Sequence, residues 1–526
     1  MIVKVCLMIL LFFGAGASCR AADGRDWWDV LHYDISIKPD YDNKFIAGAN
    51  TIRFRVLQPG ATMQIDLQQP MSITSISWHG QDLLYERTGD AYTIRFPRQL
   101  EKDEIDSVFI EFEGKPHEAV HAPFDNGWIF AKDKKGRPWM SVTCEGSGAA
   151  VWLPCKNILS DEPDSGVTLA ITVPDTLVAV GNGRLKDKTV EKNGWTTWHW
   201  AVVNTINHYD IIPYIGAYTH WQETFPGEKG ALDCDYWVLD YNLAAAKQQF
   251  KQVDSILTCF EHWMGPYPFY EDSYKVVEAP HPGMEHQSAI AYGNGFSNGL
   301  GGKDLSGTGW GLQWDFILVH ETAHEWFGNS ITAKGDGDSW IHEAFAKYAE
   351  ALYTSSVSGK AAGNEYAIGI WKRIHNDEPI VSGDTQDKYN KGSAMLHMIR
   401  QLLGDEAFRS LLRALNKHFY HQTVGTAELT AFCSRFSGHD LSKIFDQYLR
   451  TTKIPVFEYA IHDHVPQYRW ANCVKGFNMP IRVRLDGQTP QLLHPTEIWQ
   501  SITDTPGKTM TVDRNFYVKV SSTPAF

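Results

Sequence analysis

The chain has 526 residues, 43% of them hydrophobic and 13% aromatic, which is enough to build large cores in about three domains of about 150 residues each. Its 62 acidic residues outnumber its 48 lysines and arginines, which gives a formal net charge of −14. Because an acidic surface repels phosphate, this balance argues against nucleic acid as a partner.

The N-terminus has the layout of a secretory signal peptide. Lys4 precedes an apolar run at residues 5–13, and small residues follow at 14–18. We therefore expect a signal peptide at residues 1–22 and export to the periplasm or the medium. A membrane anchor is the alternative, but the apolar run is short for a bilayer span. Lipid attachment at Cys19 is the one route by which we expect membrane association, although Gly16 fits a lipoprotein signal poorly.

Cysteine usage leaves the redox state open. Two of the eight cysteines lie near the N-terminus, and the other six are Cys144, Cys155, Cys234, Cys259, Cys433 and Cys473. An exported compartment permits disulfides, and six cysteines allow fifteen complete pairings, so free buried thiols are an equally good interpretation. No C-x-x-C occurs, so a cysteine zinc site is not expected.

Residues 32–218 have the pattern of β structure. Segments such as HYDISIKPD, NTIRFRVL and SVFIEFEG alternate apolar and polar residues between turn-forming residues. This pattern predicts strands of an antiparallel sandwich or open barrel, and we place an N-terminal β domain at residues 23–220.

After residue 242, the spacing of the apolar residues changes from that of strands to that of helices. LAAAKQQFKQVDSILTCFEHWMG predicts one long amphipathic helix that ends at Gly265, and further helices are predicted at 392–403, 406–419, 427–436 and 441–449. The Gly-rich segment 293–311 lacks GxxxxGK[ST], so we interpret it as a loop and not as a phosphate site. After Pro455, apolar and polar residues again alternate as they do in strands. The expected fold is multidomain α+β, with a catalytic domain at 221–454 and a small C-terminal β domain at 455–526.

The motif with the clearest chemistry is His320-Glu321-x-x-His324, in a predicted buried helix that begins near Phe316 and stops at Gly328. Two histidines four residues apart project from one helix face, which suits two corners of a tetrahedral zinc site. Glu321 lies beside that face and can take a proton from a metal-activated water. The competing interpretation is a buried helix with two hydrogen-bonded histidines.

A catalytic zinc needs a third protein ligand and an open position for water. Glu343 follows His324 after eighteen intervening residues and lies in a second helical pattern, WIHEAFAKYAEALY. We therefore predict one zinc ion per chain, held by His320, His324 and Glu343.

With these residues in place, the chain resembles the M1 (gluzincin) family of zinc aminopeptidases, of the leukotriene A4 hydrolase and aminopeptidase N type. The resemblance is carried, in order, by HYDISIKPD, WLPCKNILSDEPD, AVGNG, PGMEH, HETAHEWFGNSIT, SWIHEAFAKYAE and YNKG. It implies an N-terminal β domain and a thermolysin-like catalytic domain. Only about 70 residues follow Pro455, so the large helical C-terminal domain of many members is missing or replaced.

The resemblance also implies roles that spacing alone does not. Glu285 of the PGMEH motif binds the free α-amine of the substrate, and Gly283 and Met284 of the same motif belong to the substrate site. Glu145, nine positions before Pro154, is the second residue of the amine site. Tyr389 donates a hydrogen bond to the oxyanion of the tetrahedral intermediate.

Three positions depart from the family motifs. His286 replaces the Asn of GxMEN, and His342 and Ala344 replace residues of the usual WLNEGF. None of the three is a predicted zinc ligand or general base. We expect them to alter the shape of the amine site, the surroundings of the metal or the pH dependence.

The function predicted from these residues is a zinc aminopeptidase that removes the N-terminal residue from peptides with a free N-terminus. Two alternatives remain open from the sequence. One is another hydrolase on the same scaffold, such as an endopeptidase or an epoxide hydrolase. The other is a non-catalytic zinc-binding protein, against which the combination of Glu321 and Tyr389 argues. The sequence does not indicate an oligomeric state or a preferred N-terminal residue.

Overall fold

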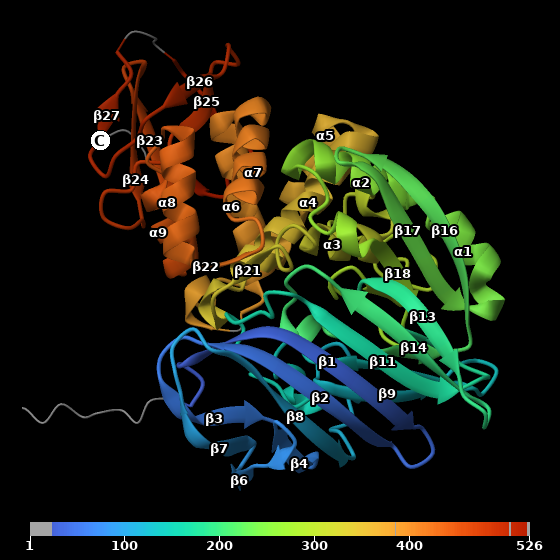
Figure 1. The fold of residues 1–526 in the computed structure, drawn as a ribbon. Coiled ribbons are helices and arrows are strands. Elements are labelled where there is room, and N and C mark those ends of the chain that lie inside the picture. The colour runs from blue at the N-terminus through green and yellow to red at the C-terminus, as the bar shows by residue number, and fades with distance from the viewer. Residues whose placement is uncertain (1–23, 384, 504–506, 523–526) are drawn as a thin grey trace, which may run out of the picture.

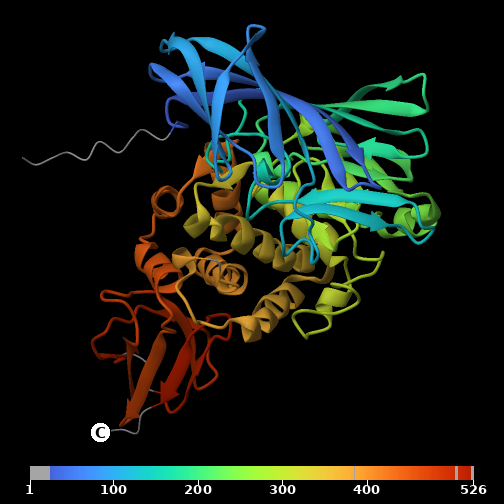
Figure 2. The same cartoon turned by 90° about the horizontal axis from the view of Figure 1, so that it is seen from below.

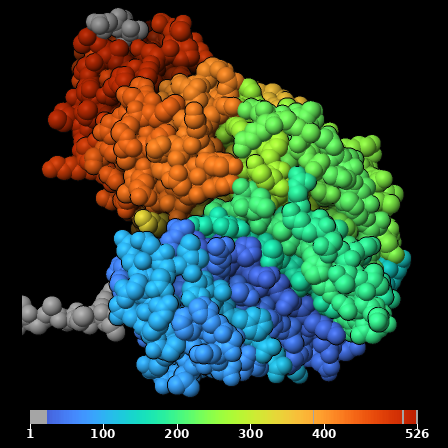
Figure 3. Space-filling model, in the orientation of Figure 1, coloured from blue at the N-terminus to red at the C-terminus, as the bar shows by residue number. Residues whose placement is uncertain are grey.

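The computed structural model describes residues 24–383, 385–503 and 507–522, and the predicted signal peptide and Cys19 lie outside these ranges. The chain is arranged in three parts (Figure 1), with the N-terminal strands in blue and cyan, a mixed part in green to orange, and the C-terminal strands in red. Seen from below, the central helices lie between the N-terminal sheets and the C-terminal strands (Figure 2). The central part, coloured green to orange, lies in contact with both the N-terminal part and the C-terminal part (Figure 3).

The N-terminal part is built around an eight-stranded sheet. Its strands are ordered β13 (Arg184–Val190), β14 (Trp195–Val202), β11 (Val167–Pro174), β1 (Trp28–Asp40), β2 (Phe45–Val56), β8 (Ile105–Gly114), β4 (Ser72–Trp78) and β5 (Gln81–Asp82). Buried Ile35 and Ile37 alternate in β1 with exposed Ser36 and Lys38, as expected for a sheet with one solvated face. The expected antiparallel pairing is confirmed for most neighbours, but β1 and β11 pair in parallel.

Two smaller sheets complete this part. One has the order β12 (Val178–Val180), β15 (Tyr214–Gly216), β10 (Pro138–Thr143) and β9 (Gly127–Lys132). The other has the order β3 (Gly60–Asp66), β7 (Ala91–Leu100) and β6 (Leu84–Thr88). Buried side chains of both join the core of the large sheet, and Met284 and Ala291 of the next part reach into the same core.

The central part begins with a five-stranded sheet of order β16 (Tyr218–Gly227), β17 (Gly230–Leu239), β18 (Tyr274–Glu278), β20 (Ile290–Tyr292) and β19 (Gly283–Met284). Every residue of β18 is buried. β17, β18 and β20 pair in parallel, whereas β19 pairs antiparallel with β20 and forms one edge of the sheet.

Helices cover this sheet and extend beyond it. They are α1 (Leu243–Gln249), α2 (Gln252–Met264), α3 (Phe316–His324), α4 (Trp340–Ser358), α5 (Lys360–Ile370), α6 (Asp387–Leu403), α7 (Asp405–His418), α8 (Thr426–Ser437) and α9 (Ser442–Arg450). Two short parallel strands, β21 (Ile331–Ala333) and β22 (Gln422–Val424), connect the region after α3 to the region after α7.

The predicted helix boundaries need four corrections. The long helix is two helices, α1 and α2, and the break coincides with Phe250, whose buried ring packs against Tyr236 and Tyr292. α3 ends at His324 and not at Gly328, because the chain turns after His324 and continues into strand β21, which pairs with β22. α5 was not expected, since two glycines interrupt its apolar pattern. α6 begins five residues before the predicted Gly392, so Tyr389 is helical.

The C-terminal part consists of two small sheets, as expected. Their orders are β27 (Gln500–Ser501), β24 (Val465–Ala471), β23 (Val456–His462), β29 (Lys519–Ser522), and β26 (Gln491–Leu493), β25 (Ile481–Leu485), β28 (Met510–Val512). Buried Phe457, Trp470 and Ile481 belong to the same hydrophobic core as the central helices. This part is therefore packed onto the central helices and is not a tethered module.

The six cysteines of the described residues are all free thiols, five of them buried. None of the helices in the described part of the chain has the length and apolar character that a membrane span needs.

Candidate metal centre and active site

The helix that carries the HExxH motif has a firmly capped beginning. The carboxylate of Asp315 accepts hydrogen bonds from the backbone N–H groups of Ile317 and Leu318, which are unpaired donors of the first turn of α3. The same carboxylate accepts further bonds from Gln249 and Tyr292. These bonds fix the start of α3, and with it the direction in which the motif's side chains project.

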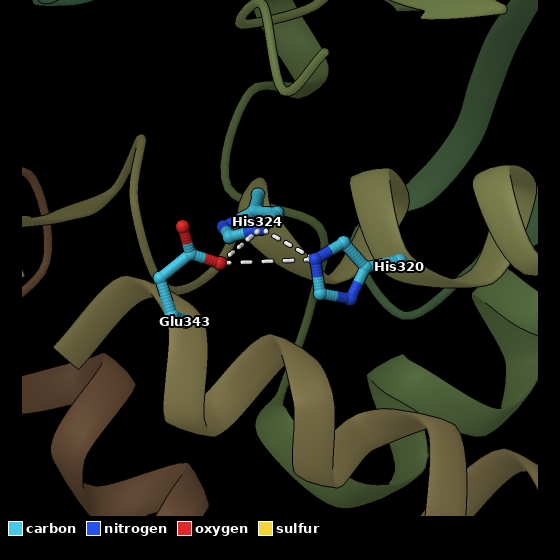
Figure 4. Close-up of side chains that lie close together, drawn as sticks. All are labelled: His320, His324 and Glu343. Atoms are coloured by element: carbon cyan, nitrogen blue, oxygen red, sulfur yellow. Dashed lines mark hydrogen bonds and ion pairs between the residues drawn. The ribbon is translucent and has the colours of Figure 1, made fainter. Parts of the chain in front are cut away.

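His320, His324 and Glu343 converge on one point between α3 and α4 (Figure 4). The Nε2 atoms of the two histidines are 3.3 Å apart, and Oε2 of Glu343 lies 3.8 Å from Nε2 of His320 and 3.6 Å from Nε2 of His324. Donor atoms about 2.1 Å from a tetrahedral zinc ion lie about 3.4 Å from one another, so these separations match the edges of a zinc site. Oε2 of Glu343 is buried and lacks a hydrogen-bond partner among the described residues, which leaves its lone pairs available to a metal ion. The three residues therefore fit zinc.

Both histidines are held by their other ring nitrogen. Nδ1 of His320 donates to Oε1 of Glu350 over 2.9 Å, and Nδ1 of His324 donates to the carbonyl of Phe327 over 3.1 Å. Each bond places the ring hydrogen on Nδ1 and leaves the Nε2 lone pair directed at the metal position.

Glu350 was not found by sequence reasoning. It is buried on α4 and is paired with Lys347 and with the hydroxyl of Tyr366. The sequence nevertheless indicates a place for it near the metal ligands, because Glu350 follows Glu343 by seven residues. This spacing puts both on one face of the helix, two turns apart.

Glu321, the expected general base, lies beside the metal ligands and is buried. Its pKa is raised to about 8, mainly by burial; His320 lowers it and the carboxylates of Glu285 and Glu343 raise it. A carboxylate with a raised proton affinity next to the metal position suits a group that takes up and returns a proton.

Gly283 and Met284 form the edge strand β19, which runs next to Glu321. A Cβ atom at Gly283 would lie 2.7 Å from Oε1 of Glu321 and 2.7 Å from the side chain of Ile317. The absence of a side chain at Gly283 therefore lets the β19 backbone approach the carboxylate of Glu321.

Glu285 follows directly after β19 and reaches the metal cluster. Its Oε2 lies 3.3 Å from Nε2 of His324, and its Oε1 accepts a hydrogen bond from the hydroxyl of Tyr209 over 2.7 Å. Burial raises the pKa of Glu285, but His324, His342 and Tyr209 outweigh it and hold that pKa well below its usual range. Tyr209 was not among the predicted residues.

Glu145, the second residue predicted for the amine site, lies near the metal cluster. Its carboxylate is within 4.8 Å of ligand atoms of both Glu285 and Glu343, although it comes from the N-terminal part. Its residue is exposed at the surface of the cluster, yet desolvation of the carboxylate among the surrounding protein atoms raises its pKa well above the usual range, and Glu285 and Glu343 raise it further. A group of three carboxylates with one open side is suited to a cationic ligand.

Tyr389 lies in the first turn of α6, next to the metal cluster. Its ring centroid is 6.3 Å from that of His320, and its pKa is raised well above the usual value by burial and then by Glu343 and Glu145. The phenol therefore keeps its proton and can act as a hydrogen-bond donor. The close crossing of α4 and α6 positions it, since a Cβ atom at Gly392 would come within 2.6 Å of Cβ of Ala344.

The three residues that depart from the family motifs, His286, His342 and Ala344, are all buried. His286 pairs through Nδ1 with the hydroxyl of Tyr214 over 2.6 Å. Nδ1 of His342 lies 3.6 Å from Oε1 of Glu285, and Ala344 packs at the α4–α6 crossing. None of the three belongs to the three-donor cluster that fits the metal.

A cavity of about 520 Å³ lies elsewhere, between the end of α2, Trp326 and α7. Its walls include Met264, Arg413 and Tyr420 and none of the residues of the metal cluster. This cavity is a feature separate from the site.

Two protein-family models match segments of this chain. The model of the peptidase M1 N-terminal domain matches residues 30–209, and that of the peptidase family M1 domain matches residues 283–448. Aminopeptidase N of Lactobacillus helveticus is 24% identical over 81% of this chain and 51% of its own length, and leukotriene A-4 hydrolase of Xenopus laevis is 21% identical over 77% and 68%. The chain spans about half the length of several curated relatives that it matches.

Among solved structures, the M1 zinc metallopeptidase from Deinococcus radiodurans superposes with a TM-score of 0.69 at 22% identity, covering 81% of this chain and 94% of that chain. A mutant form of that enzyme was crystallised with a Tyr-Ser-Ala substrate. The two family models together cover more than half of the sequence, in the expected order. The chain therefore belongs to peptidase family M1.

Proposed function

We propose that this protein is a zinc aminopeptidase that removes the first residue from peptides with a free N-terminus. The observation that carries the proposal is the distance of 3.3 Å between Oε2 of Glu285 and Nε2 of His324. In one amino acid the amine nitrogen and the carbonyl carbon are about 2.5 Å apart. An ammonium bound to a carboxylate beside a metal ligand would therefore bring the carbonyl of its own residue, and not one further along the peptide, to the metal position.

The chain's residues divide the work as follows. His320, His324 and Glu343 hold the metal, and a zinc ion there would supply Lewis acidity for the carbonyl and for the attacking water. Glu321 takes a proton from that water and returns it to the leaving amine. Tyr389 donates a hydrogen bond to the developing oxyanion.

Recognition of the N-terminus falls to the carboxylates. Glu285 forms a charge-assisted pair with the α-ammonium, and Glu145 lies close enough to add a second contact. Because an internal peptide bond has no such ammonium, these contacts favour an exopeptidase over an endopeptidase. The backbone of Gly283 and Met284, at the sheet edge, supplies the surface along which the substrate lies.

We also propose that the protein is exported, on the N-terminal sequence alone, and that its working domains are residues 23–220, 221–454 and 455–526. Membrane association is proposed only through a lipid on Cys19. The resemblance to relatives with an aminopeptidase name supports peptides as the substrate class.

Product analysis tests the proposed reaction. The zinc-loaded protein is incubated with an unblocked octapeptide, and the products are identified by mass spectrometry at successive times. An aminopeptidase gives a ladder that shortens from the N-terminus one residue at a time. Internal fragments would mean an endopeptidase, and no cleavage with zinc bound would favour an epoxide hydrolase or a binding protein.

A further inference from the structure

The two oxygens of Glu285 face different groups. Oε2 lies 3.3 Å from Nε2 of His324, on the metal side, where the substrate amine is proposed to bind. Oε1 lies 2.7 Å from the hydroxyl of Tyr209 and 3.6 Å from Nδ1 of His342, two side chains that have no assigned role. Tyr209 comes from the N-terminal part of the chain and His342 from α4, so the carboxylate is approached from two different elements.

The backbone fixes the tautomer of His342. The N–H of Ala333, in β21, donates to Nε2 of His342 over 2.7 Å, so Nε2 is an acceptor and the ring hydrogen is on Nδ1. That hydrogen faces Oε1 of Glu285, with 3.6 Å between the heavy atoms. Hydrogen bonds of catalytic groups are often long in a ligand-free site and shorten when substrate binds. The imidazole is 3% exposed, so water does not compete for this contact.

We propose that His342 and Tyr209 are positioning residues for Glu285. Together they hold Oε1 and thereby leave Oε2 directed at the substrate ammonium. The proposal deepens the aminopeptidase function and rests on it. His342 is also the neighbour of Glu343 on α4, so one helix turn carries a metal ligand and the residue that orients the amine-binding carboxylate. This arrangement sets the spacing between the metal and the amine site.

Two substitutions separate the contacts of His342. In His342→Gln, the longer amide places its oxygen near the position of Nε2, so the bond from Ala333 is kept and the donor to Glu285 is lost. In His342→Asn, the shorter amide places its NH₂ near the position of Nδ1, so the donor to Glu285 is kept. Tyr209→Phe removes the second donor with a minimal change of shape, and His397→Gln serves as a control for the same substitution at a buried histidine elsewhere.

The measurement compares two metal-binding inhibitors that differ only in the amine. L-leucine hydroxamate and its des-amino analogue, 4-methylpentanohydroxamic acid, are titrated into each zinc-loaded variant, and the ratio of their Kd values gives the benefit of the amine. We expect His342→Gln and Tyr209→Phe to reduce this benefit about tenfold or more, because a hydrogen bond to a charged group is lost. The Kd of the des-amino compound and the zinc content should stay at wild-type values. His342→Asn and His397→Gln should keep most of the benefit.

Three results would overturn the proposal. An unchanged ratio in both His342→Gln and Tyr209→Phe would show that neither residue orients Glu285. Equal weakening of both inhibitors, or loss of zinc, would show that His342 supports the metal or the fold. A wild-type protein without preference for the amine-bearing inhibitor would refute the proposed function itself and, with it, this extension; the wild-type ratio thus distinguishes the two failures.

Discussion

Oε2 of Glu285 lies 3.3 Å from Nε2 of His324, so the carboxylate proposed to bind the substrate ammonium is the direct neighbour of a predicted metal ligand. The contact joins two elements that are distant in sequence, the edge strand β19 and the end of α3. Asn329 stabilises this arrangement, since its side chain donates to the backbone carbonyl of Glu285 over 2.8 Å. The proposed amine site and the metal cluster therefore share one buried, hydrogen-bonded unit.

Glu321→Gln should keep the metal and lose most of the turnover. The amide has nearly the shape of the carboxylate but cannot take a proton, and a positioned general base is typically worth about 10²–10⁴-fold in rate. Zinc content by atomic emission and kcat on an aminoacyl amide are measured together. Glu406→Gln is the matched control, since Glu406 is exposed and pairs with Arg409 on the surface of α7. A Glu321→Gln variant with the wild-type kcat would remove the general-base assignment.

Glu350→Gln should weaken zinc binding while leaving all three ligands in place. The change removes the charge that holds Nδ1 of His320 and leaves Lys347 without its counter-ion. Loss of such outer contacts typically costs about 10–100-fold in metal affinity. Competition with a chromophoric chelator measures that affinity. An unchanged zinc Kd would mean that Glu350 serves packing alone.

Gly283→Ala should impair catalysis without loss of metal. The added methyl group meets Ile317 and the carboxylate of Glu321 at 2.7 Å, so that carboxylate has to move, and displacement of a catalytic group by about 1 Å costs about 10²-fold in rate. Gly335→Ala is the control, because a Cβ atom there meets nothing within 4 Å. Both variants are compared in kcat/KM and zinc content; equal activity of the two would contradict the close-approach argument.

His397 should make the protein less stable in mild acid. It is buried between Tyr348 and Asn515, where it connects α6 to the C-terminal sheets, and burial lowers its pKa from 6.5 to about 4. The contribution of the neutral ring to stability is complete above pH 6.5. It is lost as the pH falls from 6.5 through 4, because the unfolded chain takes up a proton that the folded chain excludes. One pKa unit is worth about 1.4 kcal/mol, so this group accounts for about 3 kcal/mol.

Denaturant unfolding of wild type and His397→Gln at pH 7.5 and pH 4.5 isolates this effect. Glutamine keeps hydrogen-bonding capacity but does not titrate, so the stability difference between the two proteins should shift in favour of the variant at the lower pH. Other buried histidines take up protons equally in both proteins, so their contributions cancel in the stability difference. If the stability difference between wild type and variant were the same at both pH values, protonation of His397 would not cause the loss of stability in acid.

The sequence was most informative where function depends on local spacing. Two histidines four apart and a glutamate on the next helix were enough to predict His320, His324 and Glu343, and the structure brings their ligand atoms together. Glu285 and Glu145 depended on resemblance, because no local pattern relates a residue before β20 to one in the N-terminal part.

Other features depend on tertiary packing. Tyr209 is 76 residues from Glu285 in the sequence, and nothing near either residue indicates that they meet. The break between α1 and α2 occurs where Phe250 is drawn into an aromatic core, although the amphipathic pattern continues through it. Parallel pairing of β1 with β11 likewise joins strands more than a hundred residues apart, whose alternation is the same as in an antiparallel sheet.

The central claim is that a carboxylate beside a zinc site selects peptides by their free N-terminus. Its most direct test is the hydrolysis of a panel of chromogenic aminoacyl amides by the zinc-loaded protein, each run beside its N-acetylated twin. The account predicts cleavage of the free-amine members only, abolished by a chelator and restored by zinc. Equal cleavage of the acetylated twins would contradict it, because Glu285 would then not be selecting an amine.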